Sequence, residues 1–242
     1  MKTRILTAVV AVPVVFCLLF FTPEWVTAIM MAIISLVCVI EVDHAFARYA
    51  KTNKKPPTFL LLPTLLVSVA IAFALGWSIY RLREVAFGQY LVLLPFLSAF
   101  ITDGGAYFVG VSIGKHRPFP KISPKKSIEG FIGGIVIGTL AVVGYTLLLS
   151  TIIPGTLGGI DVGEYYTFNY GNAVIVGMCG AIATEAGDLL FSWIKRKLGI
   201  KDYGNLIPGH GGMLDRFDSM VLCAPIVMLA NKAFPIFLVW IA

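Results

Sequence analysis

The chain has 242 residues, of which 58% are hydrophobic and only 13% are charged, whereas an average soluble domain carries about 25% charged residues. The formal net charge at pH 7 is +6. This composition excludes an ordinary soluble globular protein and indicates a polytopic membrane protein.

Apolar stretches predict the membrane-spanning elements, because roughly 18 or more apolar residues in a helix can cross a hydrocarbon core about 30 Å thick. In chain order they cover residues 5–21, 25–42, 59–76, 90–111, 128–151, 172–194 and 220–241. The first stretch follows two basic residues, as a signal peptide would, but it is long and lacks a small-residue cleavage site. We therefore expect an all-α fold of about seven transmembrane helices, within a range of six to nine.

The chain divides by expected role into two regions. Residues 1–88 would form N-terminal transmembrane helices, and residues 89–242 would form a C-terminal catalytic transmembrane region. Two polar loops of the second region, 112–128 and 195–219, are expected to carry the active site.

Basic residues are distributed unequally between the loops on the two sides of the predicted membrane. With the N-terminus inside, the outer loops hold only Arg81 and Arg83, and nearly all other Lys and Arg residues fall on the inner side. The positive-inside rule then places the N-terminus and the active-site loops in the cytoplasm, in a multi-pass protein of the cell inner membrane. A basic inner surface fits either anionic lipid headgroups or a polyanionic substrate.

Acidic residues gather near the same inner boundary, and carboxylates within the membrane are a functional hypothesis by default. These acids are Asp103, Glu129, Glu185, Asp188, Asp215 and Asp218. Glu185 and Asp188 are three residues apart, as are Asp215 and Asp218, so each pair shares a helix face. Such acids would repel one another unless a cation lay among them, and Mg²⁺ favours carboxylates together with substrate phosphates. The alternative is that each acid pairs with a nearby Lys or Arg and caps a helix.

Two loops have the composition of phosphate-binding segments. The stretch "GKHRPFPKISPKKSIEG" places five basic residues before a predicted helix start, where free N–H groups favour anions. In "PGHGGMLDR", three glycines allow the backbone to approach a ligand closely. A third motif, "GFIGGIVIG", places Gly130, Gly134 and Gly138 at four-residue spacing, which suits close helix packing within the chain or in a dimer.

The segment "SWIKRKLGIKDYGNLIPGHGGMLDRFDS", residues 192–219, closely resembles the diagnostic stretch of the CDP-diacylglycerol synthase family, also called phosphatidate cytidylyltransferases. The segments "DGGAYFVGVSIGKHRPFPKISPKKSIEGFIGG" and "EAGDLLFSWIKR" look like two further recurring segments of that family. The resemblance is specific from about residue 100 to residue 219. Gly104 departs from the Ser or Thr usual there, and the span 76–89 is short for the family.

The resemblance implies a reaction of CTP with phosphatidic acid that gives CDP-diacylglycerol and pyrophosphate in phospholipid biosynthesis. It also implies a dependence on Mg²⁺, for which Mn²⁺ can substitute, and leaves open a second, monovalent cation such as K⁺. The expected partners are CTP, phosphatidic acid and membrane lipids, without nucleic acid; a homodimer is left open.

By the same resemblance, Asp188 and Asp215 are the expected metal ligands, with Asp218 in support. Lys125 and Arg216 complete the expected catalytic set. The expected substrate-binding residues are Ser123, Lys126, Lys195, Arg196, Lys201, Asp202, His210, Gly211 and Gly212.

Other functions are compatible with parts of this pattern. A related enzyme could use a different acceptor, as a CTP-dependent kinase of polyprenol or a cytidylyltransferase of an ether lipid phosphate would. A cation transporter would distribute carboxylates along a path through the bilayer, whereas here they cluster at one end. A CDP-alcohol phosphotransferase is disfavoured because its D-x-x-D-G-x-x-A-R pattern is absent from the sequence.

Overall fold

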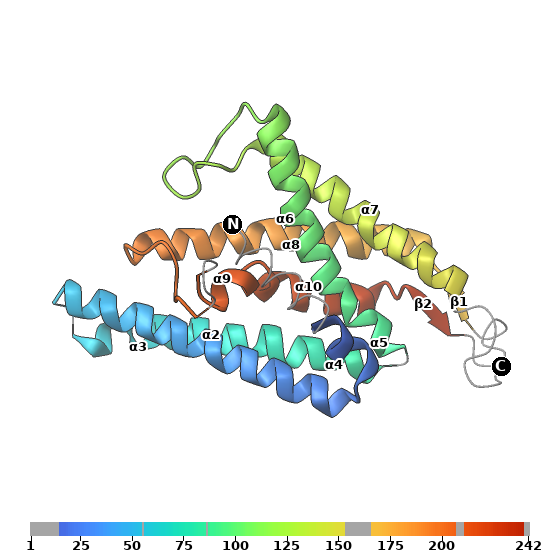
Figure 1. The fold of residues 1–242 in the computed structure, drawn as a ribbon, viewed down its shortest axis with the longest axis horizontal. Helices are drawn as coiled ribbons and strands as arrows, with labels where there is room; N and C mark the ends of the chain where they lie inside the picture. The colour runs from blue at the N-terminus through green and yellow to red at the C-terminus, as the bar shows by residue number, and fades with distance from the viewer. Residues whose placement is uncertain (1–14, 55, 86, 153–165, 207–210, 240–242) are drawn as a thin grey trace. The chain divides into compact units, whose positions relative to one another are not determined.

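The computed structural model describes residues 15–54, 56–85, 87–152, 166–206 and 211–239, and helices dominate these ranges (Figure 1). The helices are α2 (Glu24–Thr52), α3 (Pro57–Ile71), the π-helix η1 (Ala72–Trp77), α4 (Ser78–Glu84), α5 (Gly88–Leu91), α6 (Leu93–Ile113), α7 (Ile128–Ile152), α8 (Tyr170–Lys197), α9 (Leu214–Phe217) and α10 (Met220–Ala233). Two short strands, β1 (Tyr166–Phe168) and β2 (Phe237–Val239), pair antiparallel, with Thr167 opposite Leu238.

The expected helical membrane class is confirmed. Five helical stretches of the described residues are long and apolar enough to cross a membrane, namely Glu24–Thr52, Leu60–Glu84, Gly88–Ile113, Ile128–Ile152 and Tyr170–Lys197. The first expected stretch, 5–21, lies mostly outside the described residues, and its described part, 15–21, is helical.

The expectation of one continuous helix over residues 220–241 is wrong. The helix α10 ends at Ala233 after 14 residues, which span only about 21 Å at 1.5 Å per residue. Pro235 follows, and a proline disfavours helical geometry at the residue before it. The apolar residues beyond Pro235 form β2 instead of a further turn of helix.

The chain forms two compact units, which divide it differently from the expected regions by role. Unit 1 combines residues up to 93 with residues 186–225, and unit 2 combines residues 94–185 with residues from 226 onward. In unit 1, α2 lies alongside α3, and it also packs against η1 and α4 (Figure 1). Unit 1 therefore joins the N-terminal helices to the segment that carries Asp188, Asp215 and Asp218. The division by role at residue 88 stays a prediction.

In unit 2, the glycine stripe of α7 packs against other helices of the same chain. A Cβ atom at Gly134 would lie 2.9 Å from the Ala106 Cβ of α6 and 2.9 Å from the Glu185 Oε1 of α8. A Cβ atom at Gly138 would collide with the Thr102 hydroxyl of α6. The stripe thus allows α6 and α8 to approach α7 closely, as expected for packing within the chain.

Candidate functional site

A buried group of one ammonium and two carboxylates lies in unit 1. The Lys195 Nζ of α8 is 3.2 Å from the Asp215 Oδ1 and 3.1 Å from the Asp218 Oδ2. The side chains of Lys195, Asp215 and Asp218 are 12%, 3% and 10% exposed, respectively. In these contacts one positive charge faces two negative ones in a largely buried environment.

Asp215 is held by the backbone of the loop that precedes it. Its Oδ2 accepts N–H hydrogen bonds from Tyr203 and Gly212, each at 2.9 Å. The turn requires Gly211, which has a φ of +89°, and a Cβ there would lie 3.0 Å from the Asp215 Oδ2. Gly211 therefore lets the backbone approach this carboxylate closely, and the expected approach to a ligand stays a prediction.

Asp218, between α9 and α10, lies in the most unfavourable electrostatic position of the group. Burial, together with the nearby Asp188, raises the pKa of Asp218 to about 6, against the opposing effect of Lys195. The Asp188 carboxylate accepts a hydrogen bond from the Ser192 hydroxyl at 3.3 Å. The structure therefore brings Asp215 and Asp218 together at Lys195, and Asp188 is near enough to raise the Asp218 pKa; their binding of a metal stays a prediction.

Tyr203 is a member of this cluster that sequence reasoning missed. Its ring lies 5.6 Å from the Lys195 Nζ, in cation–π geometry, and the residue is almost completely buried. Burial and the nearby Asp218 and Asp215 raise the pKa of Tyr203, so its phenol stays neutral. The tyrosine within "KDYGN" was the available signal, but its spacing did not indicate which way the ring faces.

Glu41 of α2 is a second missed residue. Its Oε1 accepts the N–H of Met213 and its Oε2 accepts the N–H of Leu214, each at 2.9 Å. The residue is only 8% exposed. The available signal was a carboxylate in the middle of the apolar run "VCVIEVDHAF", where an acid is costly without partners.

The acids of unit 1 belong to the ligand type that hard divalent cations prefer. Asp188, Asp215 and Asp218 offer oxygen donors and carry more negative charge than Lys195 neutralises. Among the described residues, no group of three or more His, Cys, Asp or Glu side chains is arranged so that it could hold a metal ion by itself. This donor set suits an ion such as Mg²⁺, which is usually bound by one or two carboxylates, substrate phosphates and water.

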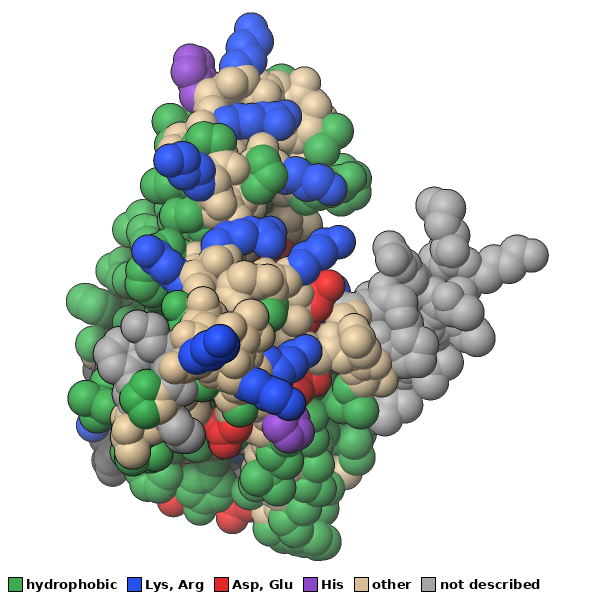
Figure 2. Space-filling view, turned by 90° about the vertical axis from the view of Figure 1, so that its left-hand side faces the viewer, with side chains coloured by type: hydrophobic (Ala, Val, Ile, Leu, Met, Phe, Trp, Pro, Cys, Tyr) green, Lys and Arg blue, Asp and Glu red, His purple; other side chains and the backbone are tan. Residues whose placement is uncertain are grey.

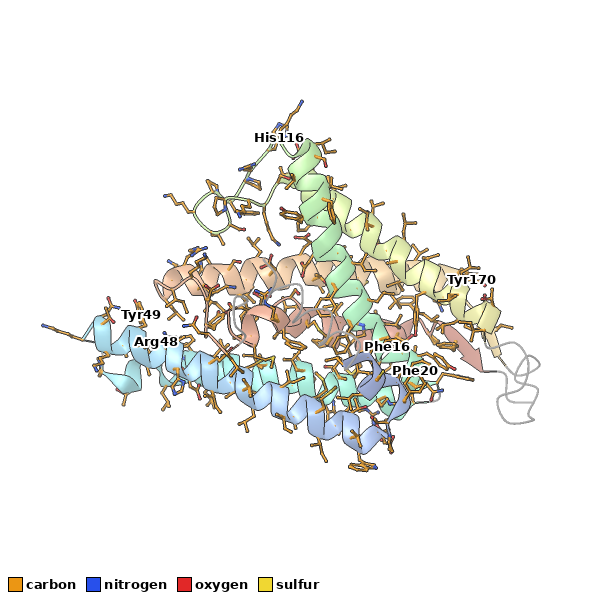
Figure 3. All side chains as sticks on the ribbon, in the orientation of Figure 1. Phe16, Phe20, Arg48, Tyr49, His116 and Tyr170 are labelled. Carbon is orange, nitrogen blue, oxygen red and sulfur yellow. The ribbon has the colours of Figure 1, made fainter. Side chains whose placement is uncertain are left out.

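Two other acids of the predicted set take ionic partners in unit 2. The Lys126 Nζ is 2.7 Å from the Glu185 Oε2, and Glu185 is 1% exposed. The Glu129 Oε1 lies 2.6 Å from the His116 Nδ1, and its carboxylate also accepts the N–H of Lys115 at 3.1 Å. Glu185 thus follows the alternative of pairing with a Lys, whereas the side-chain partner of Glu129 is a His. His116 extends from the loop between α6 and α7 (Figure 3).

Most of the remaining predicted site residues lie at the surface. Figure 2 shows Lys and Arg side chains at the surface, with hydrophobic side chains beside them. The exposed predicted site residues are Lys125, Arg196, Lys201, Asp202 and Arg216. Ser123 is half-buried, and His210 falls outside the described residues.

Comparison with known proteins gives one consistent result. The sequence pattern of the cytidylyltransferase family matches residues 64–234. A phosphatidate cytidylyltransferase of Staphylococcus aureus (strain COL) is 35% identical over 196 residues, which cover 81% of this chain and 68% of the relative. The enzyme of that name from Staphylococcus haemolyticus is 34% identical over 205 residues, 84% of this chain and 70% of the relative. The one from Bacillus subtilis is 40% identical over 133 residues, 55% of this chain and 44% of the relative.

Proposed function

The chain belongs to the cytidylyltransferase family, and from that premise we propose that it condenses CTP with phosphatidic acid to give CDP-diacylglycerol and pyrophosphate. The observation that carries this proposal is the similarity to relatives named phosphatidate cytidylyltransferase over more than two thirds of their length. Its membrane-spanning helices suit a substrate that is itself a lipid.

In this reaction, a phosphate oxygen of phosphatidic acid forms a bond to the α-phosphorus of CTP, and the bond from that phosphorus to the bridging oxygen of the β-phosphate breaks. Pyrophosphate leaves with the electron pair of that bond. Phosphoryl transfer of this kind depends mainly on positioning and on neutralising the phosphate charges. A site for it needs cationic groups and an arrangement that holds them rigidly.

We assign the metal-binding role to Asp188 and Asp215, with Asp218 in support. A bound Mg²⁺ supplies charge neutralisation and polarises phosphate oxygens. The N–H groups of Tyr203 and Gly212 hold the Asp215 carboxylate in one orientation. Lys195 keeps Asp215 and Asp218 close together. The same Lys195 ammonium is the proposed contact to a substrate phosphate.

The basic surface residues are proposed to attract the two anionic substrates. CTP arrives from the cytoplasm, and phosphatidic acid lies at the membrane interface, so the active site is proposed to face the cytoplasm. Exposed Lys and Arg residues near an interface raise the local concentration of anions. In this role we place the exposed Lys125, Arg196, Lys201 and Arg216, with Lys126, Ser123, His210 and Gly212 as further proposed substrate contacts.

The test is incorporation of labelled CTP into lipid by the purified protein in detergent, with and without Mg²⁺. Phosphatidic acid, an ether lipid phosphate and a polyprenol serve as parallel acceptors. The expected result is Mg²⁺-dependent product with phosphatidic acid, which Asp215→Asn abolishes and the control Asp43→Asn, an exposed acid on α2, retains. Product with polyprenol alone, or none from folded protein, would overturn the proposal.

A further inference from the structure

We propose that Glu41 is a positioning residue of the reaction, which acts by fixing the backbone that carries Asp215 and Asp218. The role of Glu41 in the reaction rests on the proposed function. The effect of Glu41 on the structure of the loop does not depend on that function. Glu41 lies in α2, within the part of the chain expected to provide only transmembrane helices. The family motif gives no hint of it, because that motif begins far downstream.

The contact itself is specific. The two oxygens of the Glu41 carboxylate accept one N–H each, from Met213 and from Leu214, both at 2.9 Å. These N–H groups stand at the start of α9, where a helix offers no acceptor of its own. The helix α9 has only four residues and cannot be stable by itself. Its first turn, which includes Asp215, therefore depends on a carboxylate supplied by α2.

The space around Glu41 is shaped to hold its carboxylate in one place. A Cβ atom at Gly212 would lie 2.5 Å from the Glu41 Oε2, and a Cβ atom at Gly204 would collide with the Oε1. Both glycines belong to the loop that Glu41 contacts. The loop therefore closes around the carboxylate on two sides, and a larger residue at either position would push the two apart.

A second contact from α2 fixes the same loop. An Arg48 side-chain N–H donates to the Tyr203 carbonyl at 2.9 Å, and the Tyr203 N–H donates to Asp215. Glu41 and Arg48 are seven residues apart, so they lie two turns apart on one face of the helix. Figure 3 places Arg48 on α2 toward its C-terminal end. The rigid helix thus holds the loop at two points, Tyr203 and the pair Met213–Leu214, which both precede Asp215 in the chain.

The geometry predicts a particular pattern of defects for Glu41→Gln, which keeps the size of the side chain but provides only one acceptor oxygen. Amide hydrogen exchange in the segment 211–219 should become roughly tenfold faster, because one hydrogen bond to a charged acceptor is lost. Affinity for Mn²⁺, measured directly by its spin resonance signal, should fall about tenfold or more, as when a supporting partner of a metal ligand is removed. The kcat should fall, while the KM for phosphatidic acid should stay near that of the wild type.

Three further variants make the test decisive. Glu24→Gln, the same change at an exposed position of α2, should match the wild type in every measurement. Glu41→Asp keeps both acceptor oxygens and should recover part of each loss. Gly204→Ala leaves Glu41 in place, but the new Cβ crowds the Glu41 carboxylate. It should show the same pattern of defects as Glu41→Gln, and it serves as the test if Glu41→Gln folds poorly.

Two results would overturn the inference. The first is wild-type kcat and Mn²⁺ affinity in folded Glu41→Gln. The second is a loss of Mn²⁺ affinity without faster exchange in 211–219, which would mean that Glu41 does not act through the loop. If the wild type itself fails to convert CTP, the proposed function fails, but the exchange and Mn²⁺ measurements still decide the role of Glu41.

Discussion

The Lys195 ammonium lies 3.1 Å from the Asp218 carboxylate and bridges it to Asp215, so a protein cation occupies the position between two acids. Neither acid can move away without leaving a buried charge uncompensated. This bridge connects α8 to the turn that begins α9. Lys195 therefore contributes both to the stability of unit 1 and to the charge of the proposed site.

Replacement of Lys195 by Met tests that double role. Without added divalent cation, the variant should be less stable by about 3–5 kcal/mol, since a buried carboxylate loses its partner. Addition of Mg²⁺ should raise its thermal midpoint more than that of the wild type, because Asp215 and Asp218 have then lost the Lys195 ammonium and its positive charge. The control is Lys197→Met, an exposed residue over the Trp193 ring. Equal Mg²⁺ stabilisation of variant and wild type would contradict the prediction.

Asp218 should make the stability of the metal-free protein depend on pH. Its pKa is about 6 in the folded protein, above its ordinary value of 3.8, so the folded state binds the proton more tightly than the unfolded state. Its contribution to stability is therefore present below pH 3.8 and is lost as the pH rises through about 6. The loss is on the order of 3 kcal/mol.

The measurement is the unfolding free energy of wild type and Asp218→Asn in chelator, from pH 4.5 to pH 7.5. The amide cannot ionise, so the stability of the variant relative to the wild type should increase with pH. A difference that stays constant over this range would show that the pKa of Asp218 is not raised.

The ion pair between Lys126 and Glu185 should stabilise the folded protein. Lys126→Met leaves the buried Glu185 without its 2.7 Å partner and should cost about 3–5 kcal/mol of stability. The double variant Lys126→Met/Glu185→Gln should recover much of this loss, because no charge is then buried alone. Thermal unfolding of both is compared with Lys121→Met, which changes an exposed lysine of the same loop. If the double variant is as unstable as Lys126→Met, the ion pair does not account for the stabilising effect of Lys126.

The glycine stripe of α7 provides a matched pair of substitutions. Gly138→Ala should destabilise the protein by about 1–3 kcal/mol, because the new Cβ collides with the buried Thr102 hydroxyl. Gly144→Ala, on the same helix, meets no atom within 4 Å and should be neutral or stabilising by up to about 1 kcal/mol. Thr102→Ala should relieve the defect of Gly138→Ala in thermal unfolding. Equal effects at 138 and 144 would count against the packing described.

Hydropathy predicted the helical membrane class, because long apolar runs have few alternatives in a bilayer. It failed at residues 220–241, where every residue after Ala233 is still apolar and only Pro235 marks the end of the helix. Mean apolarity does not distinguish a helix from a short strand. The backbone preference imposed by Pro235 ended the helix, and hydropathy does not register that preference.

Helical spacing predicted that Asp215 and Asp218 share a face, since residues three apart lie on one side of a helix, and both do contact Lys195. It could not identify Glu41, which is 172 residues from its partner Met213. Periodicity shows which side chains share a face, but it does not show which distant segment that face meets. For the same reason, the pairing of Glu185 with Lys126 remained one of two open alternatives.

The separation between Glu41 and its partners also affects how the protein is made. A ribosome that adds about 5–20 residues per second needs on the order of ten to thirty seconds to cover that distance. For most of this interval, α2 has left the ribosome while the peptide groups that Glu41 will bind do not yet exist. The nascent protein must keep this carboxylate hydrated or shielded by the insertion machinery. Final assembly of unit 1 therefore has to follow the synthesis of residues 213 and 214, late in translation.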